Sequence, residues 1–171
     1  MLESSRIATL AVAIPLLSLF GAGAGQAGEV ARQGTFQANW KLDGTTESVE
    51  LDGKLMSVYR LGGPVDVRRS DGLAAEFESA CSGVSDEKTG GMARCTWTDG
   101  DGDVIFLRFT GRIIGSTGTT REAEGTILGG LGKYEGLEGS IHTEWFFWES
   151  HLDEGTIIAH NTETTGSWTI P

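Results

Sequence analysis

The run GGLGKYEGLEG at Gly129–Gly139 has two competing interpretations: a loop that cradles a phosphate, or a bend between two strands of a barrel. A dinucleotide-binding fingerprint, G-x-G-x-x-G, requires a third glycine where this chain has Glu135, and it should open a helix. A Gly-Lys-Ser/Thr phosphate loop fails as well, because Tyr134 follows Gly132-Lys133. The residues after the run, SIHTEWFFWES, are typical of a strand. We therefore interpret these glycines as sites of bulges, bends and close backbone approach in a β-barrel.

The rest of the chain beyond the N-terminal segment follows an all-β pattern. Short runs rich in Val, Ile, Thr, Phe and Trp alternate with Gly and Asp-Gly, and no window keeps apolar residues at helical spacing. Asp-Gly pairs in LDGTTE (42–47) and TDGDGD (98–103) predict hairpin turns, and Gly62-Gly63-Pro64 predicts a longer loop. The predicted fold is an all-β, eight-stranded antiparallel barrel. Its strands are expected at 34–42, 47–60, 73–82, 91–98, 103–114, 119–128, 137–149 and 155–170.

The glycine run also resembles the signature of the allene oxide cyclase-like and dirigent-like barrels. Two further stretches, CTWTDGDGDVIF (95–106) and TGSWTI (165–170), resemble segments of uncharacterised exported bacterial members. The resemblance implies a calycin-like barrel with a small lumen. Plant relatives cyclise an unsaturated fatty-acid epoxide or steer phenoxy-radical coupling, and they tend to be trimers. The residues that perform this chemistry lie outside these motifs, so none of them is carried over.

The N-terminal segment predicts export. Arg6 precedes an apolar stretch at 7–20, and small residues follow at 22–27, as in a secretory signal peptide. We expect residues 1–27 to be a signal peptide and 28–171 to form a single periplasmic or secreted barrel domain. A retained N-terminal membrane anchor is the alternative, although the apolar stretch is short for a membrane span. After signal removal no membrane span is expected. The formal net charge of −11 disfavours nucleic acid as a partner.

Two cysteines, Cys81 and Cys95, lie in strand-like runs on either side of the polar stretch SDEKTGG (85–91). A hairpin through that stretch would bring the two thiols together. In an oxidising compartment we expect them to form a disulfide. Two buried free thiols are the alternative.

The strand SIHTEWFFWES (140–150) carries most of the candidate site residues. Both of its faces are aromatic, so the face that lines the lumen stays open at this stage. Alternation places four candidates on one face: His142, Glu144, Phe146 and Trp148.

A candidate catalytic pair depends on the register of the next hairpin. If the turn pairs Trp148 with Thr156, Glu144 lies opposite His160, and a slip of one residue separates them. His160 would then act as a base oriented by Glu144, or both would join His142 in a metal site. Contacts to a bound ligand and a simple solvent-facing polar pair are the alternatives. Arg108 is also expected to point into the barrel, so the ligand-binding candidates are Arg108, His142, Phe146 and Trp148.

The acidic stretch DGDGD at 99–103 could be a calcium-binding loop. Asp99, Asp101 and Asp103 alternate as in a calcium loop, but Val104 stands where that loop requires glycine. We prefer a bare turn, with weak calcium binding as the alternative, and we assign no metal and no cofactor.

Three functions remain open from the sequence. The first is a binding module that holds a small apolar molecule in the lumen. The second is a cofactor-free cyclase or isomerase of the allene oxide cyclase type. The third is a structural or interaction barrel whose core is filled by side chains.

Overall fold

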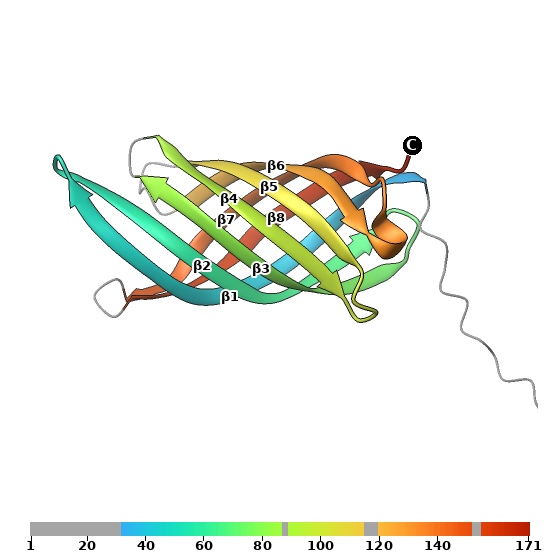
Figure 1. Cartoon of the computed structure of the whole chain (residues 1–171), viewed down its shortest axis with the longest axis horizontal. Coiled ribbons are helices and arrows are strands. Elements are labelled where there is room, and N and C mark those ends of the chain that lie inside the picture. The colour runs from blue at the N-terminus through green and yellow to red at the C-terminus, as the bar shows by residue number, and fades with distance from the viewer. Residues whose placement is uncertain (1–31, 87–88, 115–119, 152–154) are drawn as a thin grey trace, which may run out of the picture.

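The computed structural model describes residues 32–86, 89–114, 120–151 and 155–171, and the side chains of these ranges except 113–114, 120 and 147–151. The strands form a closed antiparallel barrel in which each strand pairs with its sequence neighbours and β8 pairs with β1 (Figure 1). The predicted fold class, an eight-stranded antiparallel barrel, is confirmed. Among the described residues, no helix has the length and apolar character needed to cross a membrane. The elements are β1 (Gln33–Leu51), β2 (Lys54–Arg69), β3 (Ala74–Asp86), β4 (Gly90–Asp99), β5 (Val104–Ile114), β6 (Thr120–Leu131), the 3₁₀ helix η1 (Gly132–Tyr134), β7 (Glu138–His151) and β8 (Thr156–Thr169).

Side-chain alternation separates the inside of the barrel from the outside. In β2, Leu61, Val65 and Val67 are buried, whereas Asp66 between two of them is exposed. The loop predicted at 62–64 is wrong, because these residues continue β2 and pair with β3. Glycine is needed inside this strand because a side chain at residue 63 would collide with the backbone of β1.

The first predicted hairpin turn is also misplaced. Gly44 in LDGTTE lies inside β1, where a Cβ would stand 1.9 Å from the carbonyl oxygen of Arg60. The Asp-Gly pair there permits close strand approach and does not reverse the chain. The actual turn between β1 and β2 is Asp52-Gly53, whose φ angles of 53° and 70° are those of a tight hairpin turn.

One end of the barrel, which we call the closed end, is filled by aromatic rings. It is the end where β1 begins, β8 finishes and η1 lies, at the right of Figure 1. The rings contact one another with centroid separations of 5.8–6.3 Å, within the range of favourable aromatic pairs. We call this set the aromatic plug: Phe36, Phe77, Trp97, Tyr134 and Trp168.

The glycine run forms the corner that completes the closed end. Gly132 has a φ of +66° and starts η1, which turns Tyr134 into the plug and Lys133 toward the hairpin between β4 and β5. The Lys133 ammonium lies 2.6 Å from Asp99 and 2.8 Å from Asp101. The acidic tip that suggested calcium therefore surrounds a lysine.

The Asp99 carboxylate, whose side chain is 7% exposed, contacts both η1 and the β4–β5 hairpin at this corner. Its Oδ2 accepts a hydrogen bond of 3.0 Å from the Tyr134 hydroxyl, and its Oδ1 accepts the backbone amides of Asp101 and Asp103. Burial pushes the pKa of Asp99 upward, but the hydrogen bonds from Lys133, Tyr134 and the two amides outweigh it and hold the pKa below its ordinary value.

Candidate functional site

The other end of the barrel, the open end, contains a cavity of about 310 Å³. β1, β3, β5 and β7 end here, and β2, β4, β6 and β8 begin here. The volume lies at the lower limit of the range usual for small-molecule pockets. Its wall is mainly aromatic and aliphatic and includes Trp40, Leu42, Tyr59, Leu61, Phe109 and Trp145. The polar part consists of a few hydroxyls and the charged residues Asp86, Arg112 and Arg121.

Three aromatic side chains give the cavity its shape. Trp40 of β1 and Trp145 of β7 contact each other with their ring centroids 6.1 Å apart. Tyr59 of β2 lies over Gly83, where a Cβ would stand 2.5 Å from the tyrosine hydroxyl. Burial raises the pKa of Tyr59, so the phenol stays protonated and neutral at physiological pH.

A buried polar network fixes one wall of the cavity. The hydroxyls of Thr143 and Thr164 lie 2.6 Å apart, and Trp40 Nε1 donates to Thr164 Oγ1 at 3.1 Å. Asn161 fills the irregularity where β1 and β8 lose register. Its Oδ1 accepts the Trp40 amide at 2.7 Å and its Nδ2 donates to the Ala38 carbonyl at 2.8 Å. The amide side chain thus replaces ladder hydrogen bonds that the bulge removes.

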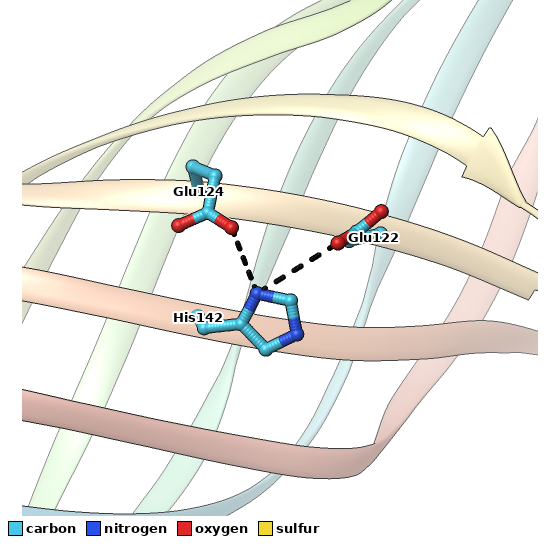
Figure 2. A group of neighbouring side chains, drawn as sticks. All are labelled: Glu122, Glu124 and His142. Carbon is cyan, nitrogen blue, oxygen red and sulfur yellow. Dashed lines mark hydrogen bonds and ion pairs between the residues drawn. The ribbon is translucent and has the colours of Figure 1, made fainter.

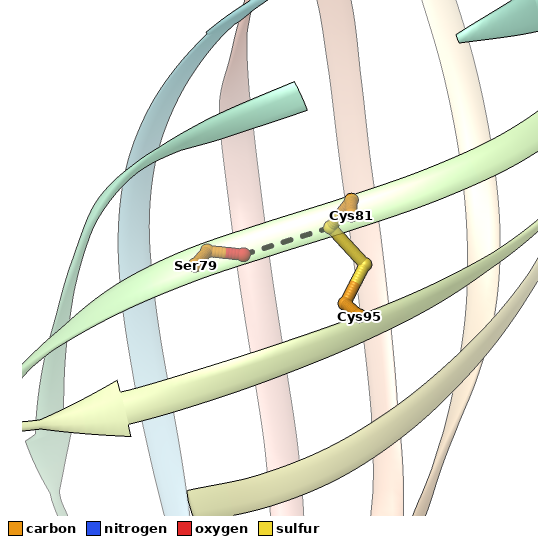
Figure 3. The surroundings of a disulfide bond; sticks show 3 residues. All are labelled: Ser79, Cys81 and Cys95. Carbon is orange, nitrogen blue, oxygen red and sulfur yellow. Dashed lines mark hydrogen bonds between the residues drawn. A yellow bond between two sulfur atoms is a disulfide. The ribbon is translucent and has the colours of Figure 1, made fainter. Parts of the chain in front are cut away.

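The predicted disulfide between Cys81 and Cys95 is confirmed, and it forms part of the cavity wall. The two cysteines are direct partners in the β3–β4 register, with Cα atoms 4.1 Å apart, which resembles the close spacing of a non-hydrogen-bonded antiparallel pair. Figure 3 shows the bridge between the two strands, with the Ser79 hydroxyl 3.5 Å from Cys81 Sγ.

The candidate residues of β7 face away from this cavity. Ile141 and Thr143 are buried, and Thr143 and Trp145 line the cavity. His142 and Glu144 therefore lie on the outer wall. The alternation predicted for this strand is correct at these positions, but the lumen takes the other face.

Arg108 is likewise on the outside. In β5, Ile105 and Leu107 are buried, whereas Arg108 is exposed, and its guanidinium donates to Thr126 Oγ1 at 3.4 Å. The expectation that Arg108 points into the barrel is wrong. The apolar residues on either side of it fill the interior instead.

The predicted Glu144–His160 pair does not form. The observed register of β7 and β8 places Glu144 opposite Glu163 and Phe146 opposite His160. Phe146 and His160 contact each other on the outer wall, with ring centroids 4.1 Å apart. The cause is the assumed turn, because Thr156 pairs with His151 and not with Trp148, which displaces the pairing by three residues. The side chain of Trp148 lies outside the described residues.

His142 instead meets carboxylates of the neighbouring strand β6. Its Nδ1 lies 2.9 Å from Glu124 Oε1 and 3.9 Å from Glu122 Oε1 (Figure 2). Its Nε2 lies 4.0 Å from Glu144 Oε1. The hydrogen bond to Glu124 raises the pKa of His142, and the charges of all three carboxylates add to this effect. Sequence reasoning did not consider the β6 glutamates.

The sequence did contain a signal for one of the true cavity residues. Trp40, Tyr59 and Trp145 all lie in predicted strands, but only Trp40 has polar or charged neighbours on both sides. Trp40 stands between Asn39 and Lys41, which predicts an inward ring. The hydrogen bonds of Asn161 depend on a bulge and carried no comparable signal.

No protein-family model matches the chain, and no curated protein matches it. Among solved structures, the chain is similar to a pterocarpan synthase dirigent protein, with 14% sequence identity and a TM-score of 0.42. The similarity covers 78% of this chain and 86% of that protein. Nothing about ligand or chemistry transfers between the two proteins at this level of similarity.

Proposed function

We propose that this barrel binds one small apolar molecule in the cavity at its open end. The observation that carries the proposal is the cavity of about 310 Å³ whose walls are mainly aromatic and aliphatic. An apolar ligand that covers such walls removes apolar surface from water, and this lowers the free energy of the complex. The hydroxyls of Ser79 and Thr143, both buried in the wall, are available to orient a polar group on the ligand.

The two other functions have less support. A barrel with a filled core does not account for the cavity. A cofactor-free cyclase or isomerase, which rested on the family resemblance and on a possible Glu144–His160 pair, loses that pair, because the two residues lie on the outer wall opposite other residues. We therefore favour binding over catalysis.

Export of the chain stays a proposal, supported by the Cys81–Cys95 disulfide, since such bonds persist in oxidising compartments. The predicted signal peptide at 1–27 lies outside the described residues. The predicted homo-oligomer also stays a proposal, as does the absence of a nucleic-acid partner. Five exposed apolar side chains on the outer faces of β1–β4 support self-association: Val49, Met56, Val58, Val84 and Met92.

A fluorescent apolar probe tests the proposed binding. We expect N-phenylnaphthylamine to bind the purified protein saturably, with one probe per chain. Ala93→Phe should weaken this binding at least tenfold, because Ala93 lines the cavity. Ala80→Phe is the matched control, since Ala80 is an exposed residue of the adjacent strand. Equal probe affinity in both variants, with unchanged circular dichroism, would reject the cavity as the binding site.

The natural ligand requires a separate measurement. Native mass spectrometry of protein purified from its own host without refolding should show a co-purifying apolar compound. The same compound should be missing from Ala93→Phe protein prepared in parallel. The spectrum also reports the oligomeric state.

A further inference from the structure

We propose that the outer wall of the barrel carries a site for a divalent transition-metal ion, with His142, Glu122 and Glu124 as its ligands. The site is separate from the cavity and extends beyond the proposed function. Each of the three residues offers one donor atom, and these atoms lie within 4.8 Å of one another. β6 supplies the two glutamates and β7 the histidine, as Figure 2 shows.

The distances match those between ligand atoms around a small metal ion. Nitrogen and oxygen ligands bind Zn²⁺ at about 2.0–2.2 Å, which places neighbouring ligand atoms of a tetrahedron roughly 3.4 Å apart. His142 Nδ1 lies 2.9 Å from Glu124 Oε1 and 3.9 Å from Glu122 Oε1. Glu124 is the most exposed of the three ligands, with 70% of its side chain accessible to solvent, so its carboxylate has room to rotate into the arrangement that a metal ion requires.

Two neighbouring side chains hold the ligands in position. Arg112 contacts Oε2 of Glu122 through Nε and a terminal nitrogen, at 2.9 and 2.8 Å, which leaves Oε1 directed at His142. Glu144 lies 4.0 Å from His142 Nε2. A carboxylate behind the second ring nitrogen is the usual partner of a metal-bound histidine. We therefore assign Glu144 as a positioning residue.

The charge of the cluster favours a dication. Glu122, Glu124 and Glu144 supply three negative charges around a single imidazole, and Arg112 offsets one of them. The other acidic cluster among the described residues, formed by Asp99, Asp101 and Asp103, already contains the Lys133 ammonium. An imidazole with carboxylates selects ions of the Zn²⁺, Co²⁺ and Ni²⁺ group over Mg²⁺ and Ca²⁺.

Calorimetric titration of the EDTA-treated protein with ZnCl₂ at neutral pH tests this site. We expect one Zn²⁺ per chain and at least tenfold weaker binding of Mg²⁺. His142→Ala and Glu124→Gln should each weaken Zn²⁺ binding tenfold or more. Glu124 is exposed, so its variant should fold normally. Asp101→Asn is the matched control in the other cluster and should leave the Zn²⁺ affinity unchanged.

Two further measurements separate a bound metal from general attraction to an acidic surface. The chain has three histidines, so the His142 ring signals in an NMR spectrum can be assigned with His142→Ala, and Co²⁺ should broaden them first. Glu144→Gln should weaken Zn²⁺ binding, with partial recovery in Glu144→Asp, and leave the unfolding temperature of the metal-free protein unchanged. Equal Zn²⁺ affinity in the native protein, His142→Ala and Glu124→Gln would overturn the proposal, as would Mg²⁺ binding as tight as Zn²⁺ binding.

Discussion

The two ends of this barrel are built from the same eight strands, yet one end is filled and the other is hollow. At the closed end, the aromatic plug packs ring against ring and Tyr134 is anchored to Asp99. At the open end, Trp40 and Trp145 contact each other only along one wall and leave a cavity beside them. Alternation alone explains which side chains point inward at both ends. The difference lies in whether an additional element, η1, fills the space between them.

This contrast assigns stability to one end and binding to the other. A filled end contributes buried apolar area and aromatic contacts to folding. A hollow end forgoes part of that free energy in exchange for a surface that a ligand can cover. Matched substitutions at the two ends test the division.

The largest effect is expected from removing one phenylalanine ring at each end. Phe77→Ala takes a buried ring out of the plug and should lower the free energy of unfolding by about 3–5 kcal/mol. Phe109→Ala removes a half-buried ring that faces the cavity, and should cost about 1–2 kcal/mol. Guanidinium denaturation of both variants gives the comparison. Equal losses would contradict a division of labour between the ends.

The disulfide should contribute the next largest effect. The Cys81–Cys95 bond links residues 14 apart in sequence, and the chain-entropy model gives about 3 kcal/mol for a loop of this size. Replacing both cysteines by alanine should lower the free energy of unfolding by this amount. Because the bond lies in the cavity wall, probe binding should weaken as well. A double variant that loses stability but binds the probe with native affinity would show that the wall does not need the bridge.

The two tyrosines of the chain provide a smaller, matched test. Tyr134→Phe removes the hydrogen bond to the Asp99 carboxylate and should cost about 1–3 kcal/mol. The Tyr59 hydroxyl has no hydrogen-bond partner among the described side chains, so Tyr59→Phe should change stability by less than about 0.5 kcal/mol. Thermal and denaturant unfolding of the two single variants measure the difference. A larger loss of unfolding free energy in Tyr59→Phe than in Tyr134→Phe would mean that the open end, and not the closed end, stabilises the fold.

The smallest effect concerns alkaline pH. Burial raises the pKa of both tyrosines above the ordinary value of 10.0, and the hydrogen bond and charge of Asp99 raise that of Tyr134 further. A raised folded-state pKa contributes stability that is complete below the unfolded-state pKa and is lost as pH rises through the folded-state value. We therefore expect stability to fall above pH 10.

Absorbance titration of the two single-tyrosine variants resolves the residues. Tyr59, observed in Tyr134→Phe, should ionise at a lower pH than Tyr134, observed in Tyr59→Phe. Tyr134 should ionise only as the closed end opens. If Tyr134 ionised at a lower pH than Tyr59, the hydrogen bond from Tyr134 to Asp99 would not persist in solution.

The sequence predicted the strands well because alternation and turn residues are local properties. The glycine run, the hairpin at 98–103 and the cysteine pair were all interpreted correctly from neighbouring residues. The Asp-Gly pair at 43–44 misled because the same glycine that permits a turn also permits close contact between strands. Only the position of Arg60 across the sheet distinguishes the two cases.

The site was harder to predict because it depends on which face of each strand points into the barrel. A strand with aromatic residues on both faces, such as β7, does not reveal which face is buried, so the sequence left the lumen-facing side open while His142 and Glu144 were kept as site candidates. The opposition of Glu144 and His160 failed because Thr156 pairs with His151, three residues beyond the assumed partner Trp148. No Asn-Gly or Asp-Gly pair marks this turn in the sequence, so its register could not be read from the residues.

The connectivity of the barrel also bears on how such a protein can change. β1 begins and β8 finishes at the closed end, whereas the odd-numbered strands end and the even-numbered strands begin at the open end. Insertions and deletions between those strand ends can alter the ligand range without touching the aromatic plug. The same arrangement gives the barrel a direction. A surface attached at the start of β1 or at the end of β8 would lie next to the closed end, with the mouth of the cavity facing away from it.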